Sequence, residues 1–146
     1  MISIEISRKI IHLFSSLIPL GYLWYVQDKF LMVVIIGLLS LFSVILELLR
    51  KKNNFIKYLF NNYFNFMLRN SEIKGNMTGA TWLLFGSLIT IFLYPIYIAV
   101  AALLFLSIGD SFAAIVGKKI PRIKIGEKSL IGSIAGILSS IFVVNL

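Results

Sequence analysis

Residues 107–135, SIGDSFAAIVGKKIPRIKIGEKSLIGSIA, hold the most informative pattern of the chain. A hydrophobic segment carries one carboxylate, Asp110, and ends in a basic loop with five Lys or Arg residues from Lys118 to Lys128. A second hydrophobic segment then opens on Lys128 and Ser129. An acid facing several cations is expected around a metal-bound phosphate chain, because Mg²⁺ takes carboxylate and phosphate oxygens together. The stretch therefore predicts two helices that meet at a charged surface with a candidate phosphate site.

The composition indicates the class of protein. Of the 146 residues, 59% are hydrophobic, and the mean hydropathy is +0.95. A soluble domain of this length leaves too much surface exposed to hide so much apolar area. The chain is therefore predicted to be an integral membrane protein. It contains no cysteine, which excludes disulfides and thiolate metal sites.

The net charge of +8 invites a nucleic-acid interpretation, but the basic residues lie almost entirely between the apolar segments. With the N-terminus inside, 13 of the 14 Lys and Arg residues face the cytoplasm, and only Lys29 lies outside. This distribution follows the positive-inside rule. We therefore expect a multi-pass membrane protein with no nucleic-acid partner, whose N-terminus and candidate site face the cytoplasm.

Apolar runs of about 20 residues predict transmembrane helices. Such runs cover residues 3–26, 30–49, 78–94, 96–117 and 129–146. Residues 55–69 place aromatic side chains near helical spacing, which predicts an amphipathic helix in the membrane interface or on the bundle surface. The first run lacks a small-residue cleavage site after it, so we expect it to be retained. The predicted fold is an all-α polytopic membrane helix bundle, with about five transmembrane helices plus one interfacial amphipathic helix in a single domain, 1–146.

Polar residues of the predicted spans lie almost entirely in their cytoplasmic halves. Residues three or four positions apart share one face of a helix, and such sets recur along the chain. They are Arg8, His12 and Ser15; Ser40, Ser43, Glu47 and Arg50; Thr78 and Thr81; Ser107, Asp110 and Ser111; and Lys128, Ser129 and Ser133. Polar and charged groups inside a membrane are costly and usually functional or paired. This one-sided polarity predicts a cavity open to the cytoplasm, with an apolar region beyond it that could admit a lipid tail.

Asp110 is the sharpest candidate site residue. It is expected to serve a metal or phosphate site, to form a structural ion pair with Arg8 or Arg50, or to be held by a hydrogen bond. Mg²⁺ prefers one or two carboxylates together with phosphate oxygens and water. Glu47 lies one helical turn from Arg50, so it is an intrahelical partner, a second acid near the metal, or a brace that aims Arg50. His12 is a general base for a hydroxyl group, a hydrogen-bond donor to phosphate, or a helix-packing histidine.

Small residues recur every four positions in the last two predicted helices. They are Gly109, Ala113 and Gly117 in one, and Gly132, Gly136 and Ser140 in the other. Such faces favour close helix packing, although Gly109 and Gly117 could instead let the backbone approach a phosphate. Lys128 differs from the other loop cations because it begins a helix, where its charge adds to the positive end of the helix dipole. Topology alone explains any one basic residue from Lys118 to Lys124.

Four stretches carry a resemblance to a known family, while the soluble nucleotide motifs GxxxxGKS/T and GxGxxG are absent. The first two are Arg8-Lys9-Ile10-Ile11-His12, which is like an RKxxH opening, and Glu47-Leu48-Leu49-Arg50, which is like ExxR. The third, Thr78-Gly79-Ala80-Thr81-Trp82 after Glu72, is like a GaTy segment. The fourth is like a long GD..A...GK…KS..GS signature and comprises Gly109-Asp110, Ala113-Ala114, Gly117-Lys118, Lys128-Ser129 and Gly132-Ser133. In this order they cover most of the chain. The chain resembles the CTP-dependent lipid kinases of membranes, which include dolichol kinase, the CTP-using diacylglycerol kinase and phytol kinase.

The resemblance implies transfer of the γ-phosphate of CTP, with Mg²⁺, to the hydroxyl of a membrane lipid alcohol at the cytoplasmic face. The alcohol would be a polyprenol, phytol or geranylgeraniol, or diacylglycerol. The residues that we assign to this chemistry are Asp110, His12 and Lys128 for catalysis; Asp110 and Glu47 for the metal; and Arg8, Glu47, Arg50, Gly109, Gly117, Lys118, Ser129 and Gly132 for the nucleotide.

Two alternatives stay open. The related phosphatidate cytidylyltransferases bind CTP but transfer its CMP moiety, so the chain could instead be a CDP-lipid synthase. It could also be a non-enzymatic membrane transporter or assembly subunit. Five helices are few to enclose both a nucleotide and a lipid, which leaves room for a homodimer.

Overall fold

The computed structural model describes residues 2–64, 68, 70–73, 75–120, 124–125 and 128–144. Over these residues the chain is all-α, as predicted, apart from one short β-ladder. The elements in chain order are α1 (Ile2–Phe14), α2 (Leu17–Gly21), η1 (Tyr22–Val26), α3 (Lys29–Lys52), α4 (Asn54–Phe64), α5 (Asn70–Ile73), α6 (Gly79–Leu93), α7 (Ile96–Leu104), η2 (Phe105–Gly109), α8 (Asp110–Lys119), β1 (Lys124–Ile125), β2 (Lys128–Ser129) and α9 (Leu130–Val144). The segments η1 and η2 are single π-helical turns.

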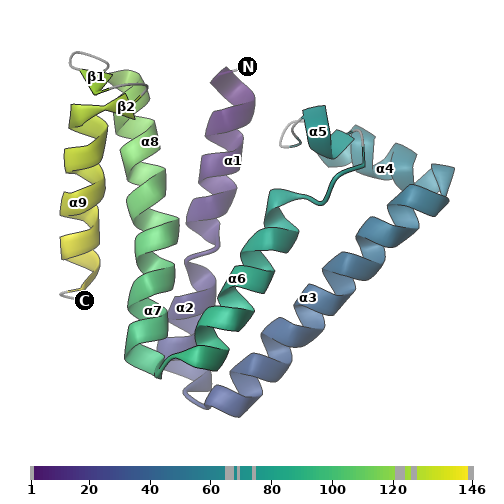
Figure 1. The fold of residues 1–146 in the computed structure, drawn as a ribbon, viewed down its shortest axis with the longest axis horizontal. Coiled ribbons are helices and arrows are strands. Elements are labelled where there is room, and N and C mark those ends of the chain that lie inside the picture. The colour runs from purple at the N-terminus through teal and green to yellow at the C-terminus, as the bar shows by residue number, and fades with distance from the viewer. Residues whose placement is uncertain are drawn as a thin grey trace.

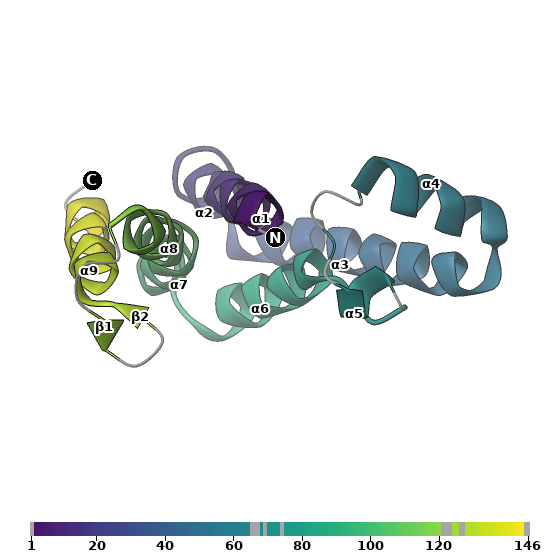
Figure 2. The same ribbon diagram turned by 90° about the horizontal axis from the view of Figure 1, so that it is seen from above.

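The helices stand side by side in one row. Across Figure 1 the order is α9, α8, α1, α6 and α3, and Figure 2 shows α1 between α8 and the α3–α6 pair. The N-terminus, the end of α8, the end of α3 and the short α5 lie together at what we call the upper end. The α2–α3 and α6–α7 connections lie at the opposite, lower end. The buried apolar core, which includes Tyr22, Met32, Ile91 and Ala99, gathers toward the lower end.

Two helices are long and apolar enough to cross a membrane. One is α3, and the other is the continuous helix Ile96–Lys119, which combines α7, η2 and α8; each has 24 residues. The Asp28 side chain caps α3 by accepting a hydrogen bond of 2.6 Å from the Leu31 amide. Pro95 separates α6 from α7, since proline cannot continue the preceding helix. Helices are therefore confirmed over the runs 30–49, 78–94 and 96–117, with α6 and α9 shorter than the two long ones.

The first predicted helix is interrupted. The run 3–26 was expected to form one helix, but α1 ends at Phe14 and α2 begins at Leu17. Pro19 explains the break, because it has no amide hydrogen to donate to the carbonyl of Ser15 one turn earlier. The π-turn η1 then ends at Gln27, whose φ of 48° reverses the chain. The prediction of a continuous helix was wrong here, although the run as a whole stays helical.

Two other boundaries also differ from the prediction. The last helix was expected to begin at Ser129, but Lys128 and Ser129 instead pair with Lys124 and Ile125 in the antiparallel β1–β2 ladder, and α9 follows. The amphipathic helix was expected over residues 55–69, but α4 ends at Phe64; residues 65–67 and 69 lie outside the described part of the chain. Because α4 lies at the upper end, it remains a candidate interfacial helix.

Glycines bring α8 and α9 into backbone contact. A Cβ atom on Gly132 would lie 2.5 Å from the Ala113 carbonyl oxygen and 2.8 Å from the Gly117 Cα. A Cβ atom on Gly109 would lie 2.6 Å from the Ser140 hydroxyl oxygen. All three separations are shorter than a real Cβ atom allows. The predicted close packing of these two small-residue faces is therefore confirmed.

This contact predicts a large difference between two identical substitutions. Gly132→Ala should lower the melting temperature in detergent, since the added methyl must push backbone aside at a cost of about 1–3 kcal/mol. Gly86→Ala in α6 is the matched control, because a Cβ there meets nothing within 4 Å. It should leave stability unchanged or raise it, as alanine favours helix more than glycine. Equal melting temperatures for the two variants would contradict the packing interpretation.

Candidate functional site

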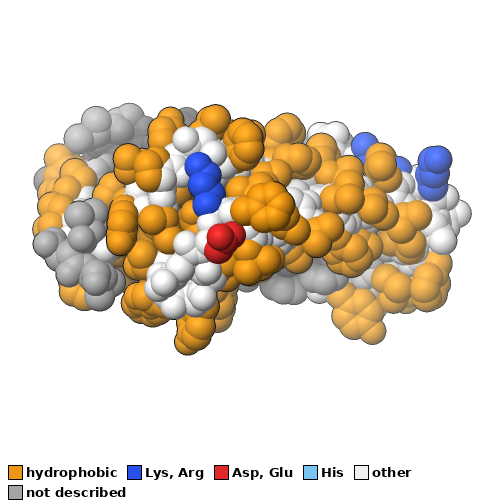
Figure 3. Space-filling model, turned by 90° about the horizontal axis from the view of Figure 1, so that it is seen from below, with side chains coloured by type: hydrophobic (Ala, Val, Ile, Leu, Met, Phe, Trp, Pro, Cys, Tyr) orange, Lys and Arg blue, Asp and Glu red, His pale blue; other side chains and the backbone are white. Residues whose placement is uncertain are grey.

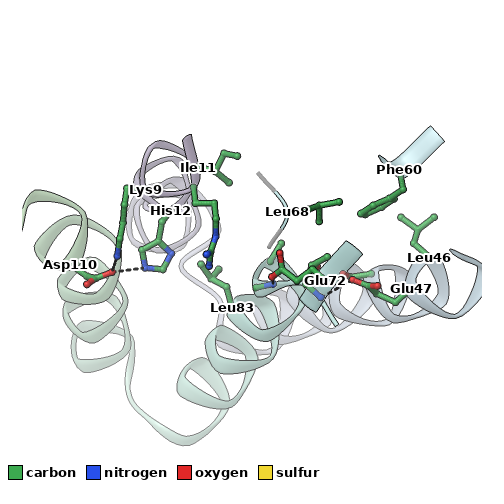
Figure 4. Close-up of a pocket in the computed structure, with 15 residues that line it drawn as sticks. Lys9, Ile11, His12, Leu46, Glu47, Phe60, Leu68, Glu72, Leu83 and Asp110 are labelled. Carbon is green, nitrogen blue, oxygen red and sulfur yellow. Dashed lines mark hydrogen bonds and ion pairs between the residues drawn. The ribbon is translucent and has the colours of Figure 1, made fainter. Parts of the chain in front are cut away.

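A cavity of about 390 Å³ lies toward the upper end, between α1, α3, α6 and the start of α8 (Figure 4). Its charged and polar lining residues are Arg8, Lys9, His12, Ser43, Glu47, Glu72, Thr78 and Asp110. Apolar side chains, among them Ile11, Phe60 and Leu83, form the rest of the wall. Residues from several of the predicted polar sets therefore line one cavity, at the end of the molecule where most of the basic residues lie.

Asp110 is the first residue of α8, and its half-exposed side chain lies at one end of this cavity. Its Oδ2 atom forms an ion pair with the Lys9 Nζ atom and lies 4.0 Å from the His12 Nε2 atom. Sequence reasoning offered Arg8 or Arg50 as ion-pair partners, and the structure supplies Lys9 instead. Lys9 and His12 are three positions apart on α1, so helical spacing could have identified Lys9.

A second bond fastens α1 to α8 at the same place. The buried Ser111 hydroxyl donates to the Lys9 backbone carbonyl oxygen at 3.2 Å. Consecutive residues of α8 thus contact both the side chain and the backbone of Lys9. The π-turn η2 ends at Gly109, directly before Asp110. Within that turn, the carbonyl oxygen of Leu106 lies 3.1 Å from His12 Nε2. Such turns often occur at functional sites, and the sequence did not predict this one.

Glu47 and Arg50 form the predicted intrahelical pair at the other end of the cavity. Both residues are buried, and Glu47 Oε2 lies 2.9 Å from Arg50 Nη2. Arg50 Nη2 also donates to the backbone carbonyl oxygens of Glu72 and Asn76, at 3.0 and 2.9 Å. The guanidinium lies over the Phe60 ring, 4.8 Å from its centre. Arg50 therefore holds the segment before α6 in place, and a role toward phosphate remains a prediction.

Two buried carboxylates meet the N-terminus of α6. Glu47 Oε1 accepts from the Thr78 amide at 2.9 Å, and Glu72 Oε1 accepts from the Gly79 amide at 2.8 Å. The first amides of a helix have no intrahelical acceptor, and the helix dipole favours negative charge there. In the sequence, Glu72 was noted only because it precedes the segment that begins at Thr78, and no role was predicted for it. The position of Glu72, six residues before Thr78, does not by itself predict its contact with the Gly79 amide, because that contact depends on how the intervening segment folds.

The described residues offer one accessible carboxylate to a magnesium ion. Asp110 is half-exposed and has one oxygen paired with Lys9, whereas both oxygens of the buried Glu47 are engaged by Arg50 and Thr78. Figure 4 shows Glu47 and Asp110 at opposite ends of the cavity, so the structure does not bring the two predicted metal ligands together. The described residues contain no group of three or more His, Cys, Asp or Glu side chains that could hold a metal. Mg²⁺ bound through Asp110 would thus take its other ligands from phosphate and water.

The remaining predicted site residues lie around the α8–α9 contact. Gly117 packs on Gly132, Lys118 is in the last turn of α8, and the Ser129 hydroxyl donates to the Ile120 carbonyl oxygen at 3.2 Å. These four residues are not among the described lining of the 390 Å³ cavity. Lys128 lies in β2, and its side chain falls outside the described part of the chain. Gly117 and Gly132 thus serve helix packing, and nucleotide contacts for this group remain predictions.

A second, shallower cavity of about 500 Å³ runs between η2, α8 and α9. Small residues form its floor, with Gly109 and Gly136 among them, and the apolar side chains of Phe105, Ile137 and Ile141 flank it. Its lining also includes Asp110. Asp110 thus belongs to both cavities. The one on the α1 side combines charged and polar side chains with an apolar wall, and the one on the α9 side is almost entirely apolar.

Comparison with known proteins finds similarity to an uncharacterized protein of Rickettsia prowazekii (strain Madrid E). The two are 26% identical over 141 residues, which cover 95% of this chain and 68% of the relative. No protein-family model and no solved structure matches the chain. A function must therefore be inferred from the residues of this chain.

Proposed function

We propose that the chain is a CTP-dependent membrane lipid kinase, which phosphorylates the hydroxyl of a polyprenol, of phytol or geranylgeraniol, or of diacylglycerol. The observation that carries this proposal is the position of Asp110 between two cavities of different chemistry. The cavity on one side offers cations and a histidine, which suit phosphate groups. The groove on the other side offers an apolar wall. A kinase for a lipid alcohol needs both surfaces at one metal-binding carboxylate.

The exterior of the chain supports a membrane location. Large side chains in the middle of α3 are exposed, including Leu38 at 62%, Leu41 at 57% and Phe42 at 59%. Soluble proteins rarely expose apolar surface on this scale, whereas a bilayer accommodates it. Figure 3 shows hydrophobic side chains over most of the face seen from the lower end, with few charged groups. We propose five membrane crossings, with the upper end and the charged cavity in the cytoplasm.

Phosphoryl transfer depends mainly on positioning and on neutralising charge. Asp110 would hold Mg²⁺, which supplies positive charge to the transferring phosphoryl group when it is bound. Arg8 lines the same cavity and would contact further phosphate oxygens. The apolar tail of the alcohol would lie along the groove between α8 and α9, entering from the bilayer, with its hydroxyl beside Asp110.

His12 is the candidate general base. The Leu106 carbonyl can only accept a hydrogen bond, so its 3.1 Å contact assigns the proton of neutral His12 to Nε2. Nδ1 is then left as the acceptor for the proton of the alcohol. As that proton leaves, the alcohol oxygen bonds to the γ-phosphorus, the bond from this phosphorus to the bridging oxygen breaks, and CDP departs.

Labelled CTP tests the proposal directly. The purified protein would be incubated in detergent with Mg²⁺, a panel of polyprenol, phytol, geranylgeraniol and diacylglycerol, and CTP labelled at either the γ- or the α-phosphate. We expect the γ-label to appear on one lipid and the α-label to stay on the nucleotide. Transfer of the α-label, with phosphatidate as the acceptor, would instead identify a CDP-lipid synthase. No transfer, together with no CTP-dependent thermal stabilisation, would indicate a non-enzymatic membrane protein.

A further inference from the structure

Lys9 pairs with one of the two oxygens of the carboxylate that the proposed metal would need. Its Nζ atom pairs with Asp110 Oδ2, the same oxygen that lies nearest to His12 (Figure 4). The Lys9 side chain is only 22% exposed, so this is a largely enclosed contact on the lysine side. In the proposed chemistry Asp110, His12 and Arg8 have roles, and Lys9 has none.

A lysine ammonium and a divalent cation cannot share one carboxylate oxygen without cost. The two cations repel each other, and the repulsion at contact distance is substantial in a partly buried site. The ammonium therefore weakens Mg²⁺ binding at Asp110 unless it moves away or additional negative charge enters. A nucleotide triphosphate brings that charge together with the metal.

The geometry allows the ammonium to move while the rest of Lys9 stays fixed. The Lys9 backbone is anchored to α8 by the Ser111 hydroxyl bond of 3.2 Å. Its four-carbon stem is flexible, and its ammonium is a compact point charge that suits phosphate oxygens. Both Lys9 and Asp110 line the cavity that also contains Arg8. A short rotation of the stem would thus carry the charge from the carboxylate to a phosphate within one cavity.

We propose that Lys9 acts as an exchangeable counter-ion: it pairs with Asp110 in the free protein, opposes binding of a divalent cation alone, and moves to the nucleotide phosphates when metal and nucleotide bind together. This inference rests on the proposed function for the identity of the nucleotide. It makes Lys9 a positioning residue for Asp110 in the free state and a phosphate-binding residue in the complex. Its consequence is that the site favours the metal–nucleotide complex over the bare metal.

Manganese binding measured by electron paramagnetic resonance tests this exchange without turnover. The full chain in detergent would be titrated with Mn²⁺ alone, and then with Mn²⁺ in the presence of β,γ-methylene CTP. Lys9→Met should bind Mn²⁺ alone about tenfold more tightly, the scale on which one neighbouring charge alters a carboxylate. The same variant should bind Mn²⁺ with the nucleotide about tenfold more weakly, because a phosphate contact is lost. Lys29→Met, the same change at the lower end, should alter neither affinity.

The opposite signs distinguish exchange from a structural role. A structural lysine would weaken both affinities when removed, and a bystander would change neither; either result overturns the proposal. Lys9→Arg provides a second test if the methionine variant folds poorly. Arginine holds a carboxylate with two donors, so Mn²⁺ alone should bind several-fold more weakly than to the wild type, and an unchanged affinity would count against the proposal.

The same experiment separates this inference from the proposed function. If the affinities change in opposite directions but no γ-phosphate reaches a lipid, the exchange stands and the kinase function fails. If γ-phosphate is transferred but both affinities fall together, the kinase function stands and the exchange fails.

Discussion

Asp110→Asn is expected to lower γ-phosphate transfer from CTP by about 10²–10³-fold, the loss typical of removing one electrostatic group from an active site. Asparagine has nearly the same shape but lacks the charge that holds a divalent cation. Folding should be nearly intact, because the half-exposed pair of Asp110 with Lys9 is expected to be worth only about 0–1 kcal/mol. The measurement is the rate of label transfer to the preferred alcohol, alongside the melting temperature in detergent.

Asp28→Asn is the matched control for this variant. Asp28 is the N-cap of α3 at the lower end, and asparagine is an equally good N-cap residue. It should therefore retain both activity and stability. Near-normal transfer by Asp110→Asn in the presence of Mg²⁺ would rule out Asp110 as the metal ligand.

Arg50→Met is expected to lower the free energy of unfolding by about 3–5 kcal/mol, the usual cost of removing one partner from a buried ion pair. Glu47 would be left as a buried carboxylate without its cation, and the carbonyls of Glu72 and Asn76 would lose their donor. The segment that leads into α6 would then be released. Chemical or thermal unfolding in detergent would measure the loss.

Lys51→Met isolates the effect of burial, because Lys51 is the next residue along α3 and its side chain is exposed. The control removes the same charge and should change stability little. Adding Glu47→Gln to Arg50→Met should recover part of the loss, since no buried charge would then remain. If Arg50→Met unfolds like Lys51→Met, the pair has no structural role, and the prediction that Arg50 binds phosphate gains support.

Hydropathy predicted the helices well where composition alone decides the structure. The long apolar runs that became α3 and the helix Ile96–Lys119 were identified from length and composition. The break between α1 and α2 was missed although Pro19 is visible in the sequence, because hydropathy says nothing about backbone hydrogen bonds. The π-turn before Asp110 has no comparable marker: its residues are as apolar as their neighbours, and its geometry depends on packing.

The residues of the candidate site were predicted individually, but of its pairings only the one between Glu47 and Arg50 was predicted. Asp110 and His12 were selected because charges and histidines are rare in apolar helices, and they do lie 4.0 Å apart. The contact of Asp110 with Lys9 joins residues 101 positions apart in the chain, so spacing could place Lys9 on the same helix face as His12 but could not reveal its pairing with Asp110. Glu47 was expected near the metal because it is an acid in the same half of the membrane. In the structure its side chain instead forms an ion pair with the buried Arg50.

The two glutamates at the start of α6 have one further consequence. A helix N-terminus beside a cavity would ordinarily attract a phosphate through its free amides. Here Glu47 and Glu72 already occupy the Thr78 and Gly79 amides, so the protein has filled that anion site with its own side chains. An incoming anion would then depend on side-chain cations rather than on these two amides. Attraction of that kind is screened by dissolved salt, which makes the affinity of this cavity for an anion responsive to ionic strength.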